Sequence, residues 1–311
     1  MIMTKIVYGL FYLISLLPFR VLYALSDVGY LIVYYVLRYR RQIVRRNLVS
    51  SFPEKSESGI IEIEKGFYHW FCDYFFEATK LLSIKEEHLK KRFKVCNVDE
   101  VEACFDNGQN VAAVLGHYCN WEWLSCMGIY LPGKVMGLIY HPLANKPFDE
   151  LFKKIRSSSR GSVVISKKHI IRKLIEYRQK KIMSLFGYIS DQGPKWENIH
   201  LWLNFMHHDT GVFTGAERIM RKVNDAVFYV EMSRPKRGYY NATFKLITKN
   251  PNALPEYEIT RRFFALLENT IRKDPKFYLW SHNRWKRTHE EFDRRFEVVN
   301  GKVIEKASSK G

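Results

Sequence analysis

The segment VAAVLGHYCNWEW, residues 111–123, decides the fold class that the sequence predicts. Its first five residues are an unbroken apolar run, which is typical of a buried strand. Gly116 permits a sharp turn directly after this run, and His117 follows it. Because sites in α/β proteins form at the carboxyl ends of strands, we expect a functional site at His117.

Four more apolar runs have the same character: Val135–Ile139, Ser162–Ile165, Ile182–Phe186 and Ala226–Val230. Stretches with helical spacing separate or flank these runs, at Trp121–Tyr130, Pro147–Ser159, Lys168–Gln179 and Thr214–Val223. Strands that alternate with helices predict an α/β fold, with a mostly parallel central sheet flanked by helices. A further strand at Tyr239–Thr248 and a long last helix at Tyr257–Lys273 complete this prediction.

The composition excludes several classes of protein. Hydrophobic residues make up 47% of the 311 residues, which is too many for a disordered chain. The five cysteines are an odd set without a CxxC pair, which favours buried thiols in a reducing compartment over a disulfide framework or structural zinc.

The formal charge of +18 favours an anionic partner: nucleic acid, a phospholipid surface, or an acidic protein or substrate. A nucleic-acid partner is not expected, because the basic residues are scattered and form no recognised binding motif.

The N-terminal segment IVYGLFYLISLLPFRVLYALSDVGYLIVYYVL, residues 6–37, carries only two charged side chains, Arg20 and Asp27. Neither half of the segment, Ile6–Phe19 or Val21–Leu37, comfortably reaches the roughly 20 apolar residues of a spanning helix. The segment has many aromatic rings, which favour the headgroup level of a bilayer. One tilted span and a pair of helices in one leaflet both stay open. A cleavable secretion signal and a buried hairpin of a soluble protein are the less favoured alternatives.

An arginine cluster follows this apolar segment: Arg38, Arg40, Arg41, Arg45 and Arg46. Such a cluster indicates the cytoplasmic side of a membrane, against anionic lipid. We therefore expect residues 1–50 to anchor the chain to a membrane and residues 51–311 to form a catalytic domain in the cytoplasm.

Residues 65–82 are strongly aromatic, whereas residues 56–63 read as a polar, loose stretch. An apolar stripe recurs in the aromatic segment at helical spacing, at Phe67, Trp70, Phe71, Tyr74, Phe75 and Ala78. Core packing is the first interpretation of this stripe, and a contact surface for acyl chains is the alternative.

His117 and Glu122 carry the chemistry that the decisive segment suggests. Glu122 falls near the first turn of the helix after His117, close enough for a shared hydrogen bond. A carboxylate on one ring nitrogen fixes the tautomer and leaves the other nitrogen free to act as a base. Cys119 lies between them and suggests a thiol nucleophile, but the spacing orders no partner around it.

The residues His117–Glu122 resemble the H-x4-D/E box, written GHxxNWE, of the late (secondary) acyltransferases of lipid A biosynthesis. Five other parts of the chain resemble this family in order: Arg40-Arg41 with Asn47-Leu48 and Phe52-Pro53-Glu54, Tyr140–Asn145 (Y-x-P-x-x-N), Arg156, Ser190-Asp191-Gln192 (A-D-Q), and Leu279–Lys286 (LWxHxRWK). The chain departs from the family pattern at Tyr118, Cys119, Ser190 and Asn283. These departures leave the expected reaction class unchanged and put the acceptor in doubt.

The resemblance implies a membrane-associated O-acyltransferase of the lauroyl or myristoyl type, with a glycerolipid-acyltransferase-like fold. Such enzymes move an acyl chain from acyl carrier protein to a hydroxyl of a Kdo-bearing lipid A precursor, at the cytoplasmic face of the bacterial inner membrane. The implied partners are acyl carrier protein and an anionic membrane lipid. No metal or nucleotide cofactor is expected, and the sequence has no HExxH motif and no Gly-rich phosphate loop after a strand. The same chemistry on an aminolipid, a glycolipid or an aryl-polyene lipid is the closest alternative, and a non-catalytic membrane adaptor is another.

The resemblance also implies roles for single residues. His117 is expected to act as the base with Glu122 as its orienting carboxylate, and a direct role of Glu122 on the hydroxyl stays open. Arg156 is expected to bind a phosphate of the acceptor or of the donor's phosphopantetheine. Asp191 is expected to order the site or an arginine. Asn120 and Gln192 are expected to be supporting polar groups. Arg284 is expected to contact lipid phosphate together with Lys286 and Arg287. These cations would lie at a membrane-facing edge that also carries Trp280 and Trp285.

Overall fold

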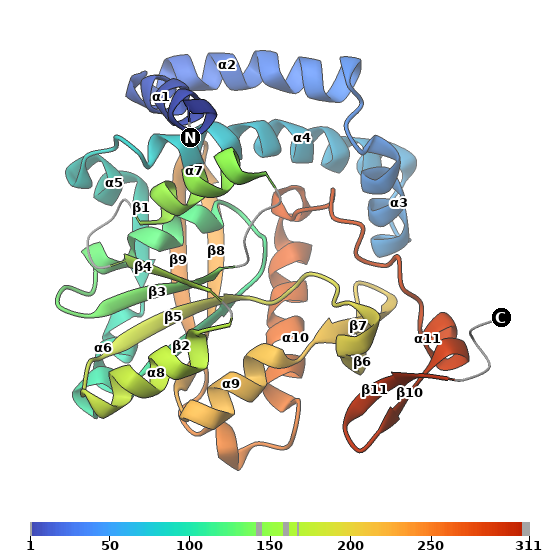
Figure 1. Cartoon of the computed structure of the whole chain (residues 1–311). Helices are drawn as coiled ribbons and strands as arrows, with labels where there is room; N and C mark the ends of the chain where they lie inside the picture. The colour runs from blue at the N-terminus through green and yellow to red at the C-terminus, as the bar shows by residue number, and fades with distance from the viewer. Residues whose placement is uncertain (1, 141–144, 158–161, 167, 307–311) are drawn as a thin grey trace.

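The computed structural model describes residues 2–140, 145–157, 162–166 and 168–306. A seven-stranded sheet forms its centre, with the strand order β1-β9-β8-β2-β5-β3-β4 (Figure 1). Neighbouring strands run parallel except β8 and β9, which form an antiparallel pair. The strands are β1 (Phe93–Cys96), β2 (Val111–Leu115), β3 (Val135–Tyr140), β4 (Ser162–Ser166), β5 (Ser184–Ile189), β8 (Ala226–Lys236) and β9 (Tyr239–Thr248). The predicted mostly parallel sheet is confirmed.

The predicted strands all exist, and two of them have the predicted bounds, β2 and β9. All five side chains of β2 are buried, because this strand lies in the middle of the sheet and both of its faces are covered. Three other features were not predicted. One is the edge strand β1. The other two are antiparallel hairpins, one formed by β6 (Ile199–Phe205) and β7 (His208–Phe213) and the other by β10 (Phe296–Val299) and β11 (Lys302–Glu305).

Helices cover the sheet. They are α1 (Ile2–Leu16), α2 (Phe19–Leu31), α3 (Arg41–Ser51), α4 (Glu57–Lys80), α5 (Glu86–Arg92), α6 (Val98–Asp106), α7 (Lys146–Arg156), α8 (Ile170–Gln179), α9 (Gly215–Val223), α10 (Glu258–Lys273) and α11 (His289–Arg295). The segment expected as a helix at Trp121–Tyr130 is a 3-10 helix over Trp121–Ile129, and its residues 121–127 are all buried. The predicted end of the helix Pro147–Ser159 lies outside the described residues.

Helix α4 begins earlier than predicted. Residues 57–63 are helical, so the expected loose stretch is wrong. Ser56 caps the helix, because its hydroxyl accepts a hydrogen bond from the backbone N–H of Gly59 at 3.3 Å. The aromatic stripe is mostly core, as first interpreted: Phe67, Trp70 and Tyr74 are at most 5% exposed.

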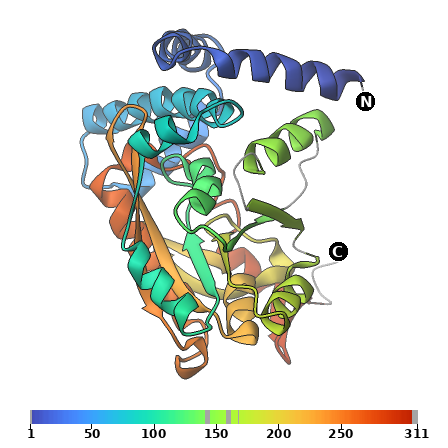
Figure 2. The same ribbon diagram turned by 90° about the vertical axis from the view of Figure 1, so that its left-hand side faces the viewer.

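The helices α1 and α2 form a separate layer on the outer side of α4 (Figures 1 and 2). The apolar N-terminal segment is therefore two helices joined at Leu17-Pro18. Their outward side chains are large and apolar, among them Ile6, Leu10, Leu13, Leu25, Val28 and Leu31, each at least 42% exposed. By length and composition, the stretch Phe19–Val36 is long and apolar enough to cross a membrane. Large apolar side chains that are exposed along two neighbouring helices are typical of a surface that contacts a membrane or another protein.

Candidate active site

His117 and Asp191 meet at the carboxyl ends of two neighbouring strands. His117 follows β2 after one residue, and Asp191 follows β5 after one residue. These strands pair in parallel with Leu115 opposite Ile189, so their ends reach the same edge of the sheet. His117 Nδ1 lies 2.5 Å from Asp191 Oδ1. This contact joins residues 74 positions apart in the sequence.

The glycine between β2 and His117 is required by packing. A Cβ atom on Gly116 would lie 2.6 Å from a methyl carbon of Leu267 in α10. The backbone of His117 is also fixed by the C-terminal segment, because its carbonyl accepts a hydrogen bond from the N–H of Leu279 at 3.1 Å. The imidazole ring is therefore presented from a rigid strand end.

The other ring nitrogen of His117 faces solvent and Gln192. Gln192 Nε2 lies 3.3 Å from His117 Nε2 and is positioned to donate to it. With a carboxylate at Nδ1 and an amide donor at Nε2, the contacts correspond to the tautomer that carries its hydrogen on Nδ1. Nε2 then holds the electron pair that accepts from Gln192, and the His117 side chain is 18% exposed.

Asp191 is buried and remains ionised. Burial alone would raise its pKa, but the charge of His117, their hydrogen bond and the charge of Arg284 together hold the pKa of Asp191 well below its usual range. Arg284 Nη2 lies 3.4 Å from Asp191 Oδ2, and the Arg284 side chain is only 3% exposed. The buried charge is thus compensated on both sides.

Glu122 does not pair with His117, so the predicted hydrogen bond between them is wrong. The Glu122 carboxylate instead accepts two hydrogen bonds from Arg156, at 2.8 Å from Nε and 2.7 Å from Nη2. Tyr74 and Trp121 each donate to the same carboxylate at 3.2 Å. Glu122 is 1% exposed, and its charge raises the pKa of Arg156 although burial alone would lower it. The two carboxylates therefore have separate partners, Asp191 the histidine and Glu122 the arginine.

Arg156 lies where the resemblance expects it, at the end of α7, and two of its nitrogens are bound to Glu122. Its side chain is 20% exposed. Its guanidinium also lies 5.9 Å from the ring centre of Tyr140, at the end of β3. Arg156 therefore borders the same edge of the sheet as His117.

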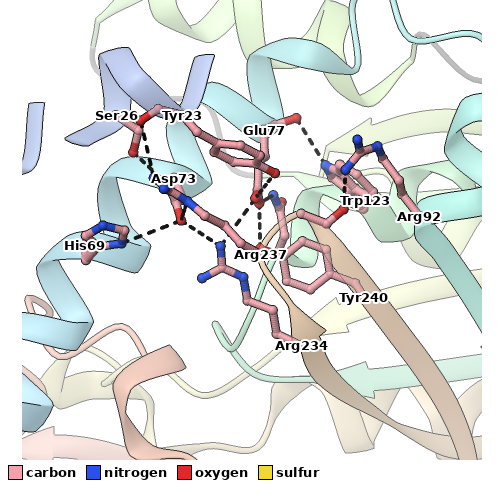
Figure 3. Close-up of polar contacts among 12 residues, drawn as sticks. Tyr23, Ser26, His69, Asp73, Glu77, Arg92, Trp123, Arg234, Arg237 and Tyr240 are labelled. Atoms are coloured by element: carbon pink, nitrogen blue, oxygen red, sulfur yellow. Dashed lines mark hydrogen bonds and ion pairs between the residues drawn. The ribbon is translucent and has the colours of Figure 1, made fainter. Parts of the chain in front are cut away.

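Asn120 lies beneath the site and not in it. It is fully buried, and its amide donates to Glu77 Oε2 of α4 at 3.0 Å. Glu77 also accepts hydrogen bonds from Tyr240 of β9 at 2.5 Å and from Tyr23 of α2 at 3.0 Å (Figure 3). The side chain of Asn120, expected as a supporting polar group, anchors the loop after His117 to this buried network.

A second carboxylate of α4 extends this network toward the layer of α1 and α2. Asp73 accepts hydrogen bonds from Ser26 of α2 at 2.7 Å, from Arg234 at 2.6 Å and from Arg237 at 2.6 Å (Figure 3). Asp73 and Glu77 are four positions apart, so both lie on one face of α4. Asp73 and Glu77 are the two carboxylates within the strongly aromatic stretch 65–82, and they were the signal in the sequence that could have indicated this network.

The expected position of Arg284 at a membrane-facing edge is wrong. Arg284 is buried beside Asp191, and Trp280 is 1% exposed. The segment around them packs against α3, where Asn47 donates to the carbonyls of Trp280 and His282 at 2.8 and 3.0 Å. This segment supports His117 and Asp191 from the inside of the protein.

Cys119 is not placed to act as a nucleophile. It is fully buried, and its burial raises the pKa of the thiol well above its usual range. Its backbone lies in the left-handed region with φ 53°, and its N–H donates to the carbonyl of Phe277 at 2.9 Å. Cys119 therefore belongs to the structural side of the loop.

An open cleft of about 950 Å³ begins beside Gln192. Its apolar lining comes from strand and helix residues, among them Ile139, Ile170, Ile189, Phe213 and Ile219. Three exposed cations also line it, and we call them the cationic rim: Lys195, Arg218 and Lys222. The cleft thus combines space for a long apolar group with polar Gln192, whose amide contacts His117.

This arrangement suits proton abstraction from a hydroxyl that attacks a carbonyl carbon. His117 has a carboxylate behind Nδ1, and its Nε2 contacts Gln192, which lines the apolar cleft.

A comparison with protein families agrees with this chemistry. The family described as bacterial lipid A biosynthesis acyltransferase matches residues 1–287, which is most of the chain. No curated protein matches the chain.

Proposed function

The chain belongs to the bacterial lipid A biosynthesis acyltransferase family, and from this premise we propose that it moves a fatty acyl chain from acyl carrier protein to a hydroxyl of a lipid A precursor. The observation that carries the proposal is the pair of His117 and Asp191 at the end of an apolar cleft. A general base next to space for an acyl chain is what an O-acyltransferase needs.

The proposed step conserves every proton. His117 Nε2 takes the proton of the acceptor hydroxyl while the hydroxyl oxygen attacks the carbonyl carbon of the thioester. Asp191 holds the Nδ1 hydrogen and stabilises the imidazolium that forms. When the tetrahedral intermediate collapses, the C–S bond breaks and the imidazolium returns its proton to the leaving thiolate. The products are the acyl ester and the free thiol of the carrier.

The negative oxygen of the tetrahedral intermediate requires hydrogen-bond donors. The N–H groups of Tyr118 and Cys119 already bond the carbonyls of Gly116 and Phe277. We therefore assign this role to the first backbone N–H groups of the 3-10 helix at Trp121, together with the Gln192 amide. The reaction as proposed needs no metal and no cofactor beyond the acyl donor.

Arg156 is proposed to bind a phosphate of the acceptor or of the donor's phosphopantetheine arm. Its pairing with Glu122 orients the guanidinium from behind, as a bidentate pair does. In this proposal Glu122 positions Arg156 and does not act on the histidine.

The N-terminal layer supports a location at the inner membrane with the site facing the cytoplasm. The apolar side chains of α1 and α2 face outward, and the inner face of α2 bonds Asp73 and Glu77 through Ser26 and Tyr23. These bonds favour a pair of helices in one leaflet over a single span, because a span would carry the polar face into hydrocarbon. Residues 1–50 are proposed as the anchoring part and residues 51–311 as the acyltransferase part.

Mass spectrometry of lipid A tests the proposed function. A deletion strain of the source bacterium is compared with the same strain complemented by the wild-type gene or by His117→Ala. We expect loss of one acyl chain that only the wild type restores, and the mass difference gives the chain length. An unchanged lipid A profile in a strain without a redundant enzyme would exclude this acceptor and direct the search to other lipids of the same extract.

A further inference from the structure

We propose that the cationic rim, Lys195, Arg218 and Lys222, is the surface on which the acidic acyl carrier protein docks. This inference rests on the proposed function and adds to it the place where the donor binds. From this rim the thioester arm would extend along the cleft toward Gln192 and reach His117.

The charge of the cleft lining is one-sided. Among the described residues that line it, four are cationic and none is acidic. Arg221 is the fourth cation, and its guanidinium is occupied by Glu217 at 2.7 Å and by backbone carbonyls of residues 251–255. Arg218 and Lys222 make no ion pair within the described part of the chain, and Lys195 has Glu197 at 4.0 Å. Unpaired surface cations of this kind attract an acidic partner and orient its approach.

The rim lies on the side of the molecule that a membrane leaves free. Helix α9, which carries Arg218 and Lys222, is at the opposite end of the molecule from α1 and α2 in both views (Figures 1 and 2). A protein that docks on α9 does not compete with the bilayer for space. The acceptor lipid would come from the membrane side and the carrier from the opposite side.

The shape of the cleft agrees with this direction of entry. Its volume of about 950 Å³ is at the upper end of the range for small-molecule sites, roughly 300–1,000 Å³. Two of the rim residues, Arg218 and Lys222, lie on α9, and Gln192 lies 3.3 Å from the base. A flexible arm that carries an apolar chain can therefore connect the docked carrier to His117.

Two thioester donors with the same acyl chain test the proposal. One is the acylated carrier protein, and the other is the uncharged N-acetylcysteamine thioester, which has no carrier domain. For the full-length protein in detergent, we expect Arg218→Glu with Lys222→Glu to raise the KM for the acylated carrier about tenfold or more. The KM for the small thioester and the kcat with either donor should stay within about twofold, because neither Arg218 nor Lys222 has a hydrogen bond or ion pair with His117, Asp191 or Gln192 among the described contacts. The neutral double variant Arg218→Gln with Lys222→Gln should raise the KM for the acylated carrier less than the charge reversal does. It removes the two positive charges without placing two like charges four positions apart on α9.

A charge-matched control separates docking from net charge. Lys249→Glu with Lys302→Glu changes the same number of charges at exposed positions outside the cleft, so the KM for the carrier should stay within about twofold. In the wild type the KM for the carrier should also rise with salt, and the rim variants should lose most of this dependence. An equal loss with both donors, or no loss with either, overturns the proposal. Weaker binding of the rim variants to anionic vesicles, with unchanged carrier kinetics, would assign the rim to lipid and also overturns it.

A binding experiment makes the test independent of catalysis. The Kd of a fluorescently labelled carrier protein for the full-length chain is measured by anisotropy, and the rim variants should weaken it by the same factor as they raise KM. If the wild type binds the carrier through the rim but acylates no lipid A precursor, the proposed acceptor fails and the docking surface stands. If the wild type does not bind the carrier, or the rim variants bind it as tightly as the wild type, the docking surface fails.

Discussion

The substitution Asp191→Asn tests the pair at the centre of the site. It keeps the size of the side chain and removes the negative charge behind His117. Asp191 is 1% exposed and does not line the cleft, whereas its neighbours Ser190 and Gln192 do. The substitution should therefore act on the chemical step and leave substrate binding nearly unchanged.

The expected size of the effect follows from the contact between the two side chains. The ring nitrogen and the carboxylate oxygen are 2.5 Å apart, so the centres of the two charges in the imidazolium form lie about 4 Å apart. At an effective dielectric constant of about 20, this attraction amounts to about 4 kcal/mol. The attraction exists in full only after His117 has taken the proton, so its loss raises the barrier. We expect kcat to fall about a thousandfold with KM within about threefold of the wild type.

The assay is steady-state transfer from acylated carrier protein to a lipid A precursor in detergent micelles. Ser190→Ala is the matched control, because it changes the adjacent residue to the one that the family usually carries, and it should keep kcat. Asp191→Glu retains the charge and should recover part of the lost rate. A kcat of Asp191→Asn within tenfold of the wild type would refute the reasoning, and a raised KM at unchanged kcat would assign Asp191 to substrate binding. Thermal unfolding of each variant shows whether the fold is intact.

Three further predictions follow from buried groups. Glu122→Gln should lower the free energy of unfolding by about 3–5 kcal/mol, because it leaves Arg156 unpaired. Adding Arg156→Gln should restore most of the lost stability in denaturant titrations. Equal stability of the wild type, the single variant and the double variant would contradict a stabilising ion pair between Glu122 and Arg156. Cys119→Ala should keep kcat within about threefold, and thiol alkylation should not inhibit the folded wild type; rapid inactivation by alkylation would reopen a thiol mechanism. Burial raises the pKa of Asp225 to about 7, so its ionised form costs stability, and the cost grows from about pH 4 to pH 7. Asp225→Asn should therefore stabilise the protein by a few kcal/mol at pH 8 and by almost nothing at pH 4, and a gain that is the same at both pH values would contradict the burial argument.

The central part of the fold could be predicted because buried parallel strands are continuous apolar runs. Val111–Leu115 is such a run, and its predicted bounds are confirmed. The edge strand Phe93–Cys96 could not be found in this way. It is four residues long, alternates buried Phe93 with exposed Lys94, and follows directly on the cationic end of α5. The hairpin β6–β7 mixes polar and aromatic residues in the same manner, since it lies outside the central sheet.

The sequence predicted helices in the N-terminal region, but it determined neither the number of helices in residues 6–37 nor the residue at which α4 begins. The length of each apolar half left a span and a pair of helices open, and the break falls at Pro18, where a helix loses a backbone donor. The early start of α4 depended on one local contact, the Ser56 cap, which a polar sequence conceals. A serine followed by polar helical residues reads equally well as a loop.

The pairing of the site residues could not be predicted from the sequence. His117, Glu122, Arg156 and Asp191 all gather at one edge of the sheet, as the resemblance implies. The pairing of His117 with Glu122 followed from nearness in the sequence. The strand order overrides this nearness, because β5 and not β3 is the neighbour of β2, and β5 brings Asp191 to the histidine. Periodicity gives the elements of a parallel sheet but not the order in which they pair.

This separation of the two carboxylates also explains why the site needs both. A base of neutral charge requires a partner that stabilises its protonated form, and Asp191 supplies it with Arg284 as a counter-charge. A phosphate-binding arginine requires a partner that orients it without blocking all of its donors, and Glu122 takes Nε and Nη2 only. The H-x4-E spacing therefore places two residues with separate proposed functions at the end of one strand, the base and the support of the arginine.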